Sequence, residues 1–409
     1  MASLKYWVWL SSRPGMGPLT ALRVLNWFAS PEQVFFAPEQ AYRDVGGLTP
    51  RDIEALSDKN LSSAAKTLEA CAENGYRIIT LGDGDYPARL LNIADPPLVL
   101  YVRGRLPVMD EEAAIAVVGT RKCTPYGVKE AERLGYELTR CGCLVVTGLA
   151  RGIDTTVALG ALRAGGRVVG VLGSGLDIVY PPENRQLFED VAAVGAILSE
   201  YPPQTPAAGE HFPRRNRIMS GLCVAVAVVE APKKSGALIT ANFALEQGRD
   251  VYALPGNVDA PACAGSNQLL REGAVLVTSG REIAEEYMAL FPEKICLDRE
   301  KVPLDKKRAD NLARGAADTN RRISAKKEID NAKTVEYIDL VKLKERLNDA
   351  EYAVVTAIGS ETRHIDEIIA ACALRAGDVL SLLTLLELDG VVEQSSGKYF
   401  KLCDRINAE

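Results

Sequence analysis

The strongest constraint on the fold is a series of short, continuously apolar segments that recurs through the middle of the chain. These segments alternate with stretches of helical periodicity and cover residues 115–118, 144–146, 168–172, 196–198, 224–229, 251–254 and 274–277. A strand without polar side chains must be covered on both faces, and helices between successive strands allow those strands to run parallel. The pattern therefore predicts an α/β domain with a doubly wound, mainly parallel sheet.

The sequence before this series predicts two further features. Residues 1–74 show apolar residues at three-to-four spacing with two glycine turns, which predicts a small helical domain. One of these turns, Gly15-Met16-Gly17, resembles a helix-hairpin-helix element, whose backbone N–H groups can hold a DNA phosphate; a purely structural turn is the alternative. Residues 76–81 and 98–102 read as strands that extend the sheet, so the α/β domain is assigned to residues 75–292.

After residue 292 the composition changes. Residues 293–345 carry mixed charge with few large apolar side chains, which predicts a flexible linker. Three helical segments and a small hairpin then predict a winged-helix domain over residues 346–403. Its recognition helix, residues 376–389, contains three acidic residues and no lysine or arginine. Duplex DNA would repel such a helix, so we expect this domain to contact another protein or to have a regulatory role.

Composition narrows the class of protein. The chain has 409 residues, of which 47% are hydrophobic, and this is enough for two or three globular domains. Its nine cysteines are odd in number, scattered and free of CxxC pairs, which indicates reduced thiols and a cytoplasmic location. The longest apolar run, residues 222–229, is far short of the ~20 residues that cross a bilayer, so no membrane segment is expected.

Histidine usage and the missing nucleotide fingerprint argue against several mechanisms. His211 and His364 are the only histidines, and they lie in different predicted domains, so a His-rich zinc site and a His-dependent triad are poorly supported. No GxGxxG follows the first strand of the series, which disfavours a dinucleotide cofactor. We therefore expect neither a metal nor a cofactor.

Polar, glycine-rich and basic loops follow the strands, at the edge of the sheet where open parallel sheets bind ligands. Glycine lets the backbone approach an anion, while hydroxyl and cationic side chains donate to phosphate oxygens. A chain of net charge −6 has thus gathered cations at one edge. We predict that an anionic ligand binds there through Gly119, Thr120, Arg121, Lys122, Gly148, Arg151, Gly173, Ser174, Gly175, Arg214, Arg215, Asn216, Arg217, Lys233, Lys234, Ser235 and Gly236.

Each of these elements also has a structural interpretation when taken alone. The Gly173-Ser174-Gly175 sequence is compatible with a tight turn that binds nothing. The three arginines between residues 214 and 217 are compatible with a solvated helix start whose charges pair with Glu200 or Glu210. Two lysines on a loop, at 233 and 234, are unremarkable. The recurrence of such elements at one edge of one sheet favours the functional interpretation.

Several of these segments resemble, in order, the sequence blocks of the DprA/Smf family. The family pattern GSRxxSxYG is similar to GTRKCTPYG at residues 119–127, and SGxARGID is similar to TGLARGID at residues 147–154. The family's LGxGLDxxYPxxN block matches residues 171–184, and two further blocks match residues 200–221 and 229–248. The sequences Leu254-Pro255-Gly256 and GSNQLLR at residues 265–271 complete the run. The resemblance covers roughly residues 75–279.

The resemblance implies an extended Rossmann-like domain that binds single-stranded DNA without sequence specificity, forms a homodimer, and hands DNA to the recombinase RecA during natural transformation. Arg121 and Lys234 occupy the positions expected to contact DNA phosphates, and the arginines of the FPRRN block line the same pocket. The departures from the family are mild: Thr120 and Thr147, for example, replace serines and keep the hydroxyl while adding a methyl group. The resemblance favours a binding protein over an enzyme.

A nucleotide-processing hydrolase is the alternative class. Rossmann-like phosphoribohydrolases hydrolyse nucleotides at the same sheet edge, but they resemble a PGGxGTxxE pattern that this chain lacks. The sequence Pro255-Gly256-Asn257-Val258 diverges from it after the second residue. Asp154, Asp177 and Glu246 are candidate acids in principle, although N-capping or ion pairing is the simpler role for each.

Overall fold

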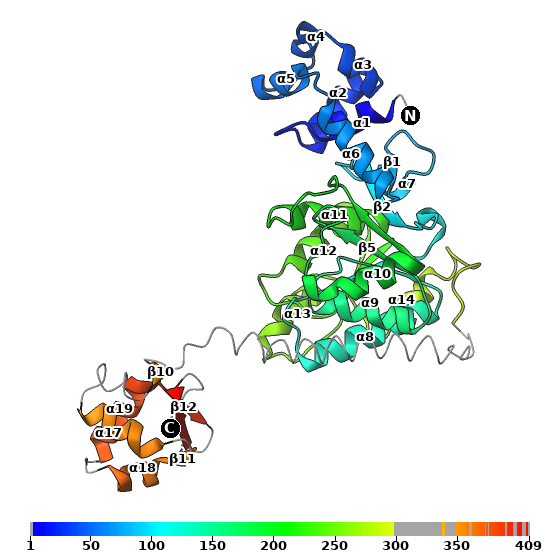
Figure 1. The fold of residues 1–409 in the computed structure, drawn as a ribbon. Coiled ribbons are helices and arrows are strands. Elements are labelled where there is room, and N and C mark those ends of the chain that lie inside the picture. Colours follow the sequence, from blue (N-terminus) through cyan, green and yellow to red (C-terminus); the bar gives the residue numbers. More distant parts are fainter. Residues whose placement is uncertain are drawn as a thin grey trace. The chain divides into compact units, whose positions relative to one another are not determined.

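The computed structural model describes residues 3–297, 338–339, 349–359, 362–372, 374, 376–388, 391–395, 399–402 and 406–407. The chain forms two compact units, Met1–Thr319 and Asn320–Glu409 (Figure 1). Most of the predicted linker, from residue 298 onward, lies outside the described residues. No helix in the described part of the chain is long and apolar enough to cross a membrane.

Six helices form the N-terminal part of the first unit. Local capping explains where several of them begin: proline occupies a first-turn position in α2, α3 and α5. At α5, the Thr49 hydroxyl accepts the Asp52 N–H at 3.2 Å, and the Asp52 carboxylate accepts the Thr49 N–H at 2.8 Å. Trp9 and Tyr42 are fully buried at the centre. The helices are α1 (Leu4–Ser11), α2 (Pro18–Phe28), α3 (Pro31–Phe36), α4 (Glu39–Arg43), α5 (Pro50–Ser57) and α6 (Ser62–Glu73).

The Lys59 ammonium lies among the aromatic rings of this core, 4.7 Å from the Tyr42 ring centroid and 5.4 Å from that of Trp9. Burial, with a smaller contribution from the Arg13 charge, lowers the pKa of Lys59 from 10.5 to about 8. The unfolded chain therefore binds more protons than the folded one between these two values. The contribution of Lys59 to stability therefore rises with pH across that window.

We accordingly expect the N-terminal helices to resist denaturant better at about pH 9 than at about pH 7, because the charged form of Lys59 is disfavoured only in the folded state. All three tryptophans of the chain, Trp7, Trp9 and Trp27, lie in these helices, so tryptophan fluorescence reports their unfolding selectively. Lys59→Met should lose most of the pH dependence, and the exposed control Lys66→Met should retain it. Equal pH dependence in both variants would contradict the assignment.

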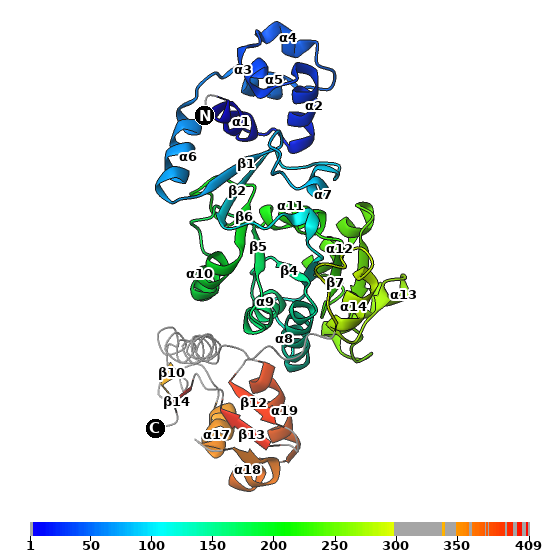
Figure 2. The same ribbon diagram turned by 90° about the vertical axis from the view of Figure 1, so that its right-hand side faces the viewer.

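The centre of the first unit is a nine-stranded sheet with the order β1-β2-β6-β5-β4-β3-β7-β8-β9. Figure 2 shows the succession from β1 through β2 and β6 to β5. β1 pairs antiparallel with β2, and β2 pairs antiparallel with β6; the remaining neighbours are parallel. The predicted doubly wound, mainly parallel fold is confirmed. The strands are β1 (Arg77–Thr80), β2 (Val99–Gly104), β3 (Ala114–Val118), β4 (Leu144–Thr147), β5 (Val168–Leu172), β6 (Ala196–Ser199), β7 (Ala225–Val228), β8 (Asp250–Ala253) and β9 (Val275–Leu276).

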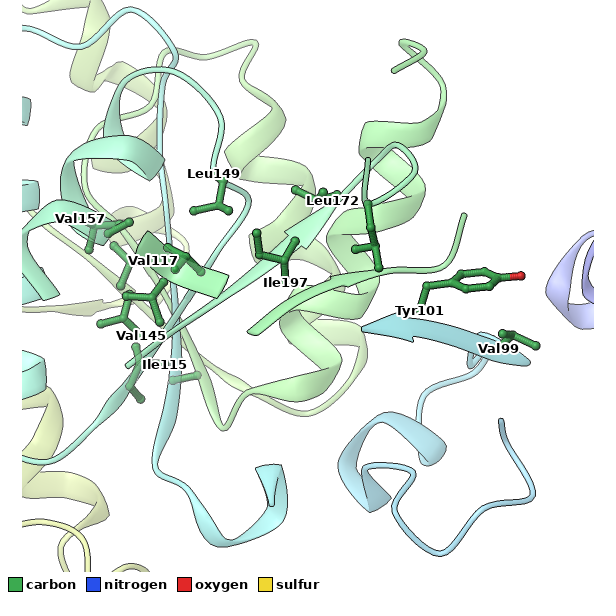
Figure 3. Packing of buried hydrophobic residues seen from close by; sticks show 14 of the residues in the cluster. Val99, Tyr101, Ile115, Val117, Val145, Leu149, Val157, Leu172 and Ile197 are labelled. Carbon is green, nitrogen blue, oxygen red and sulfur yellow. The ribbon is translucent and has the colours of Figure 1, made fainter. Parts of the chain in front are cut away.

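Helices cover both faces of the sheet. Alternate residues of β3 enter different cores: Ile115 and Val117 pack on the face shown in Figure 3, and Ala116 packs on the other. The first face carries α8 (Pro125–Arg140), α9 (Ile153–Arg163), α10 (Arg185–Val194) and α14 (Gly280–Tyr287), and its core continues into the N-terminal helices. The second carries α7 (Ala88–Leu91), α11 (His211–Leu222), α12 (Gly236–Glu246) and α13 (Ala264–Arg271). Short 3₁₀ turns are η1 (Met109–Glu111), η2 (Pro182–Asn184) and η3 (Pro261–Cys263).

The first residues of the predicted linker pack against this domain. Ile295 is buried in the same core as the sheet, and the Lys294 ammonium lies 3.0 Å from the buried Glu112 carboxylate. The Cys296 N–H also donates to the Cys141 carbonyl at 3.0 Å. The domain thus continues to at least residue 297, because one apolar and one cationic side chain anchor a segment that composition alone assigned to the linker.

The second unit has the three helices and hairpin expected of a winged-helix domain. Its helices pack around a small apolar core that includes Val355, Ile368 and Leu383. β13 lies between β11 and β12 and pairs antiparallel with both. The elements are β10 (Ile338–Asp339), α17 (Asp349–Ile358), β11 (Arg363–His364), α18 (Ile365–Ala371), α19 (Ala376–Leu388), β12 (Val392–Ser395), β13 (Tyr399–Leu402) and β14 (Ile406–Asn407).

Candidate nucleic-acid interface

A pocket of about 600 Å³ opens where the chain reverses direction across the sheet. From β3 the chain proceeds to β4, β5 and β6 on one side, then returns to β7 on the other, so the loops after β3 and β7 diverge. Such a switch point leaves a crevice at the carboxyl ends of the strands. Eight of the residues predicted from the sequence line the pocket: Gly119, Thr120, Arg121, Arg215, Asn216, Lys234, Ser235 and Gly236.

Arg121 lies on the loop between β3 and α8. Its guanidinium carbon is 4.7 Å from the centroid of the Phe212 ring at the start of α11, and the Phe212 ring is 5.6 Å from that of Tyr180. All three side chains line the pocket. In the described part of the chain Arg121 forms no ion pair, so its charge is available to a ligand. A cation and two aromatic rings suit a strand that carries both phosphates and flat bases.

Arg215 has a different environment. Its side chain is buried, and Nη1 donates to the Gly148 carbonyl at 2.9 Å, while the Val171 carbonyl accepts a second bond from the same nitrogen. Burial lowers the pKa of Arg215 to about 10, and the nearby Asp154 carboxylate partly offsets this effect. Burial also raises the pKa of Asp154, against the charge of Arg215. The pair forms part of the pocket lining and ties α11 to the strands beneath it.

The start of α12 forms the opposite side of the pocket. Ser235 is the N-cap residue, and its hydroxyl accepts the Ala237 N–H at 3.3 Å. Lys234 is exposed just before it, and Gly236 is the first helical residue, with open space where a Cβ would project. The free N–H groups of a helix N-terminus favour an anion. This side of the pocket therefore matches the phosphate-binding chemistry expected from the sequence.

Other predicted residues lie outside the pocket lining and have partners within the protein. Gly148 accommodates Arg215, since a Cβ there would come within 2.2 Å of its guanidinium. Arg151 forms an ion pair with Glu183. The Ser174 hydroxyl donates to the Ile178 carbonyl at 3.2 Å, and the Gly175 N–H donates to the Thr205 carbonyl at 2.9 Å. Gly173 packs against Phe212, which makes its role indirect.

The remaining predicted cations fall into two groups. Lys122, Arg214 and Lys233 are exposed on the loops and the helix that border the pocket. Arg217, in contrast, is 2% exposed, and its guanidinium lies 3.0 Å from the Asp95 carboxylate and 2.6 Å from that of Glu200. Two carboxylates already neutralise Arg217, and it does not line the pocket. We therefore remove it from the proposed interface.

Sequence reasoning missed the two aromatic side chains of the pocket, Phe212 and Tyr180. Both belong to blocks that the resemblance singled out, but the search for an anion site selected glycine, hydroxyl and cationic residues only. An aromatic residue beside a basic one, as in the FPRRN sequence, is the signal that a single-strand site would have justified.

The acids considered for hydrolysis do not gather in the pocket. Asp154 belongs to its lining, but its carboxylate faces Arg215 and accepts the Ala150 N–H at 3.4 Å. Asp177 accepts the Gln204 N–H at 2.8 Å, and Glu246 ends α12. No group of three His, Cys, Asp or Glu side chains among the described residues is arranged to hold a metal ion.

Comparison with known proteins identifies the family of this chain. The family described as DNA recombination-mediator protein A matches residues 77–288, and the DprA winged helix domain matches residues 342–398. The chain belongs to the DprA/Smf family. It is 35% identical to Protein Smf of Synechocystis over 97% of this chain and 98% of that protein. This family is one of DNA-processing proteins and recombination mediators, and the second match confirms the winged-helix prediction.

Two further DprA/Smf proteins show how the similarity is distributed. The DNA processing protein DprA of Bacillus subtilis is 42% identical over 54% of this chain and 74% of that protein. The X-ray structure of DNA processing protein A from Streptococcus pneumoniae gives a TM-score of 0.62 at 33% identity, and the match covers 69% of this chain and 97% of that chain.

Proposed function

We propose that this DprA/Smf protein binds single-stranded DNA, without sequence specificity, in the pocket between the Arg121 loop and the start of α12. The observation that carries the proposal is that Arg121 and Lys234, which form no ion pair with any described residue, share one recess with the Phe212 and Tyr180 rings. Cations on both sides of the pocket interact with phosphates, and the rings stack on bases of any identity, at ~1–3 kcal/mol per base.

The recess favours a single strand over a duplex. Bases in a duplex are stacked and paired, so their faces cannot reach aromatic rings that line a pocket, whereas unpaired bases can. Fluorescence anisotropy of labelled single strands and of the matching duplex, at two salt concentrations, tests this preference. We expect the single strand to bind more tightly at both. Tighter binding of the duplex would reject the proposed pocket as the binding site.

Gly236→Ala tests whether a phosphate approaches the start of α12. A Cβ at this position meets no protein atom within 4 Å, so the fold should tolerate the change. If a phosphate packs against the Gly236 N–H, the added methyl group should weaken single-strand binding by about three- to ten-fold, since a misplaced hydrogen bond costs ~1 kcal/mol. Gly209→Ala, also in the pocket lining with open space at its Cβ, is the matched control outside a helix start. Unchanged affinity in Gly236→Ala would place the phosphate elsewhere.

We also propose that the protein forms a homodimer and helps to load RecA recombinase onto the bound strand during DNA uptake. The family resemblance supports both roles. For the dimer, β9 is the edge strand of the sheet among the described residues, and its Val275 and Leu276 are 43% and 54% exposed. Exposed apolar residues on an unpaired edge strand are typical of a surface that another chain covers.

The proposal also covers the location of the protein, the absence of catalysis and the role of the second unit. We propose a cytoplasmic binding protein without catalytic turnover, and a screen for nucleotide hydrolysis, run on the preparation used for anisotropy, tests the hydrolase alternative. In the second unit, Asp378 is exposed at the start of α19 and gives that helix an acidic first turn. This supports a role in protein contacts rather than in reading duplex DNA.

A further inference from the structure

Glu230 carries a buried carboxylate and is not among the residues proposed to contact DNA. It lies two residues after the end of β7 and is 0% exposed. No lysine, arginine or histidine in the described parts of the chain forms an ion pair with it. Burying a charge without an opposite charge is costly, so the contacts of this side chain must explain its presence.

These contacts hold both ends of the loop that carries Arg121. At one end, the Glu230 carbonyl accepts the Thr120 N–H at 2.7 Å. At the other, the Glu230 carboxylate accepts the Thr124 N–H at 2.9 Å and the Thr124 hydroxyl at 2.7 Å. Arg121 lies between these two anchor points. One residue of the loop after the neighbouring strand β7 thus fixes the backbone on either side of the arginine.

Surrounding residues are arranged to receive this carboxylate. Thr124 is the N-cap of α8, so the carboxylate lies at the positive end of a sixteen-residue helix. Gly127 leaves the necessary room, because a Cβ there would come within 2.3 Å of Oε2. The Cys263 thiol lies 3.8 Å from Oε1. A glutamine has nearly the same volume, but it lacks the negative charge at this helix N-terminus and replaces one of the two acceptor oxygens by an NH₂ donor.

We propose that Glu230 is a positioning residue for DNA binding, which acts on the bound strand only through the Arg121 loop. This inference rests on the proposed function and deepens it. Loss of the Thr124 contacts frees one end of the loop and lets the arginine leave its position over Phe212. A pre-organised cation binds a phosphate more tightly than a mobile one, because less conformational freedom is lost on binding.

Glu230→Gln is the direct test, with Glu112→Gln as the matched control. Glu112 is a second buried glutamate, located before β3 at the opposite ends of the strands, where it pairs with Arg167 and Lys294. By single-strand anisotropy we expect Glu230→Gln to bind about ten-fold more weakly and Glu112→Gln less than about two-fold. A folded Glu230→Gln protein with wild-type affinity would overturn the proposal.

The same substitution in an Arg121→Ala background separates positioning from a general structural effect. If Glu230 acts through Arg121, Glu230→Gln should cause no further loss there; the same ten-fold loss would overturn the proposal. If Arg121→Ala itself leaves the affinity for single strands unchanged, the proposed binding site is wrong, which is a different outcome from rejection of the role of Glu230.

A second pair of variants keeps the inference testable if Glu230→Gln does not fold. Thr124→Ser retains the hydroxyl that donates to Glu230, and Thr124→Val removes it at nearly constant volume. We expect the serine variant to bind single strands as the wild type does and the valine variant to bind several-fold more weakly. Equal affinities in the two folded variants would reject the role of this contact.

Discussion

Replacing Arg217 by methionine is expected to destabilise the first unit by about 3–5 kcal/mol, one of the largest losses that a single substitution can cause here. The guanidinium is buried between the Asp95 and Glu200 carboxylates, at 3.0 and 2.6 Å. Methionine keeps most of the side-chain volume but leaves two carboxylates without a partner. Burial already raises the pKa of both, and the charge of Arg217 opposes that rise.

The pH dependence of this loss follows from the same two groups. Without Arg217, the pKa of each carboxyl rises further in the folded state, so the folded variant binds more protons than the unfolded chain at acidic pH. Its stability deficit should therefore shrink as the pH falls. Urea denaturation of Arg217→Met and of the exposed neighbour Arg214→Met measures both effects, and Arg214→Met should stay within about 0.5 kcal/mol of the wild type. Equal stabilities would contradict the assignment of Arg217 as a structural residue.

Removal of the two unpaired cations across the pocket should have the largest effect on binding. Arg121→Ala and Lys234→Ala should each weaken single-strand binding by about ten-fold, because a hydrogen bond to a charged group contributes ~1.5–3 kcal/mol. The double variant should bind about a hundred-fold more weakly, provided that the two residues contact different phosphates.

Neither substitution should unfold the protein, because both side chains are exposed and form no ion pair within the described residues. The control is Arg163→Ala, at the end of α9, where the arginine pairs with Glu132. It removes one positive charge away from the pocket and should leave affinity nearly unchanged. If Arg163→Ala weakens binding as much as Arg121→Ala does, overall charge rather than the pocket controls binding.

The sequence predicted the sheet well, because its signal is local. A strand buried on both faces must be apolar throughout, and each apolar run of the central series became a strand whose ends differ from the predicted ones by at most one residue. The strand order was beyond such reasoning. Whether β6 lies beside β2, or β7 beside β3, depends on packing between segments distant in sequence.

The candidate site was likewise predictable from local motifs only in part. Arg121 and Lys234 were assigned from motifs, and the structure brings them to one pocket, while Arg217, assigned from a third block, is buried and lies outside the pocket lining. Pairing with Glu200 was the structural alternative considered from the sequence, whereas the second partner, Asp95, lies in the segment between α7 and β2, and no local pattern connects it to Arg217. A basic motif therefore indicates where cations gather, but burial decides which of them can reach a ligand.

The salt dependence of single-strand affinity tests the central claim most directly. Each phosphate neutralised in a single strand contributes about 0.7 to the slope of log K against log salt, since bound counterions are released. The slope of the Arg121→Ala, Lys234→Ala double variant should therefore be shallower than that of the wild type by about 1.4. Identical slopes would show that these residues do not contact phosphates and that the DNA binds elsewhere.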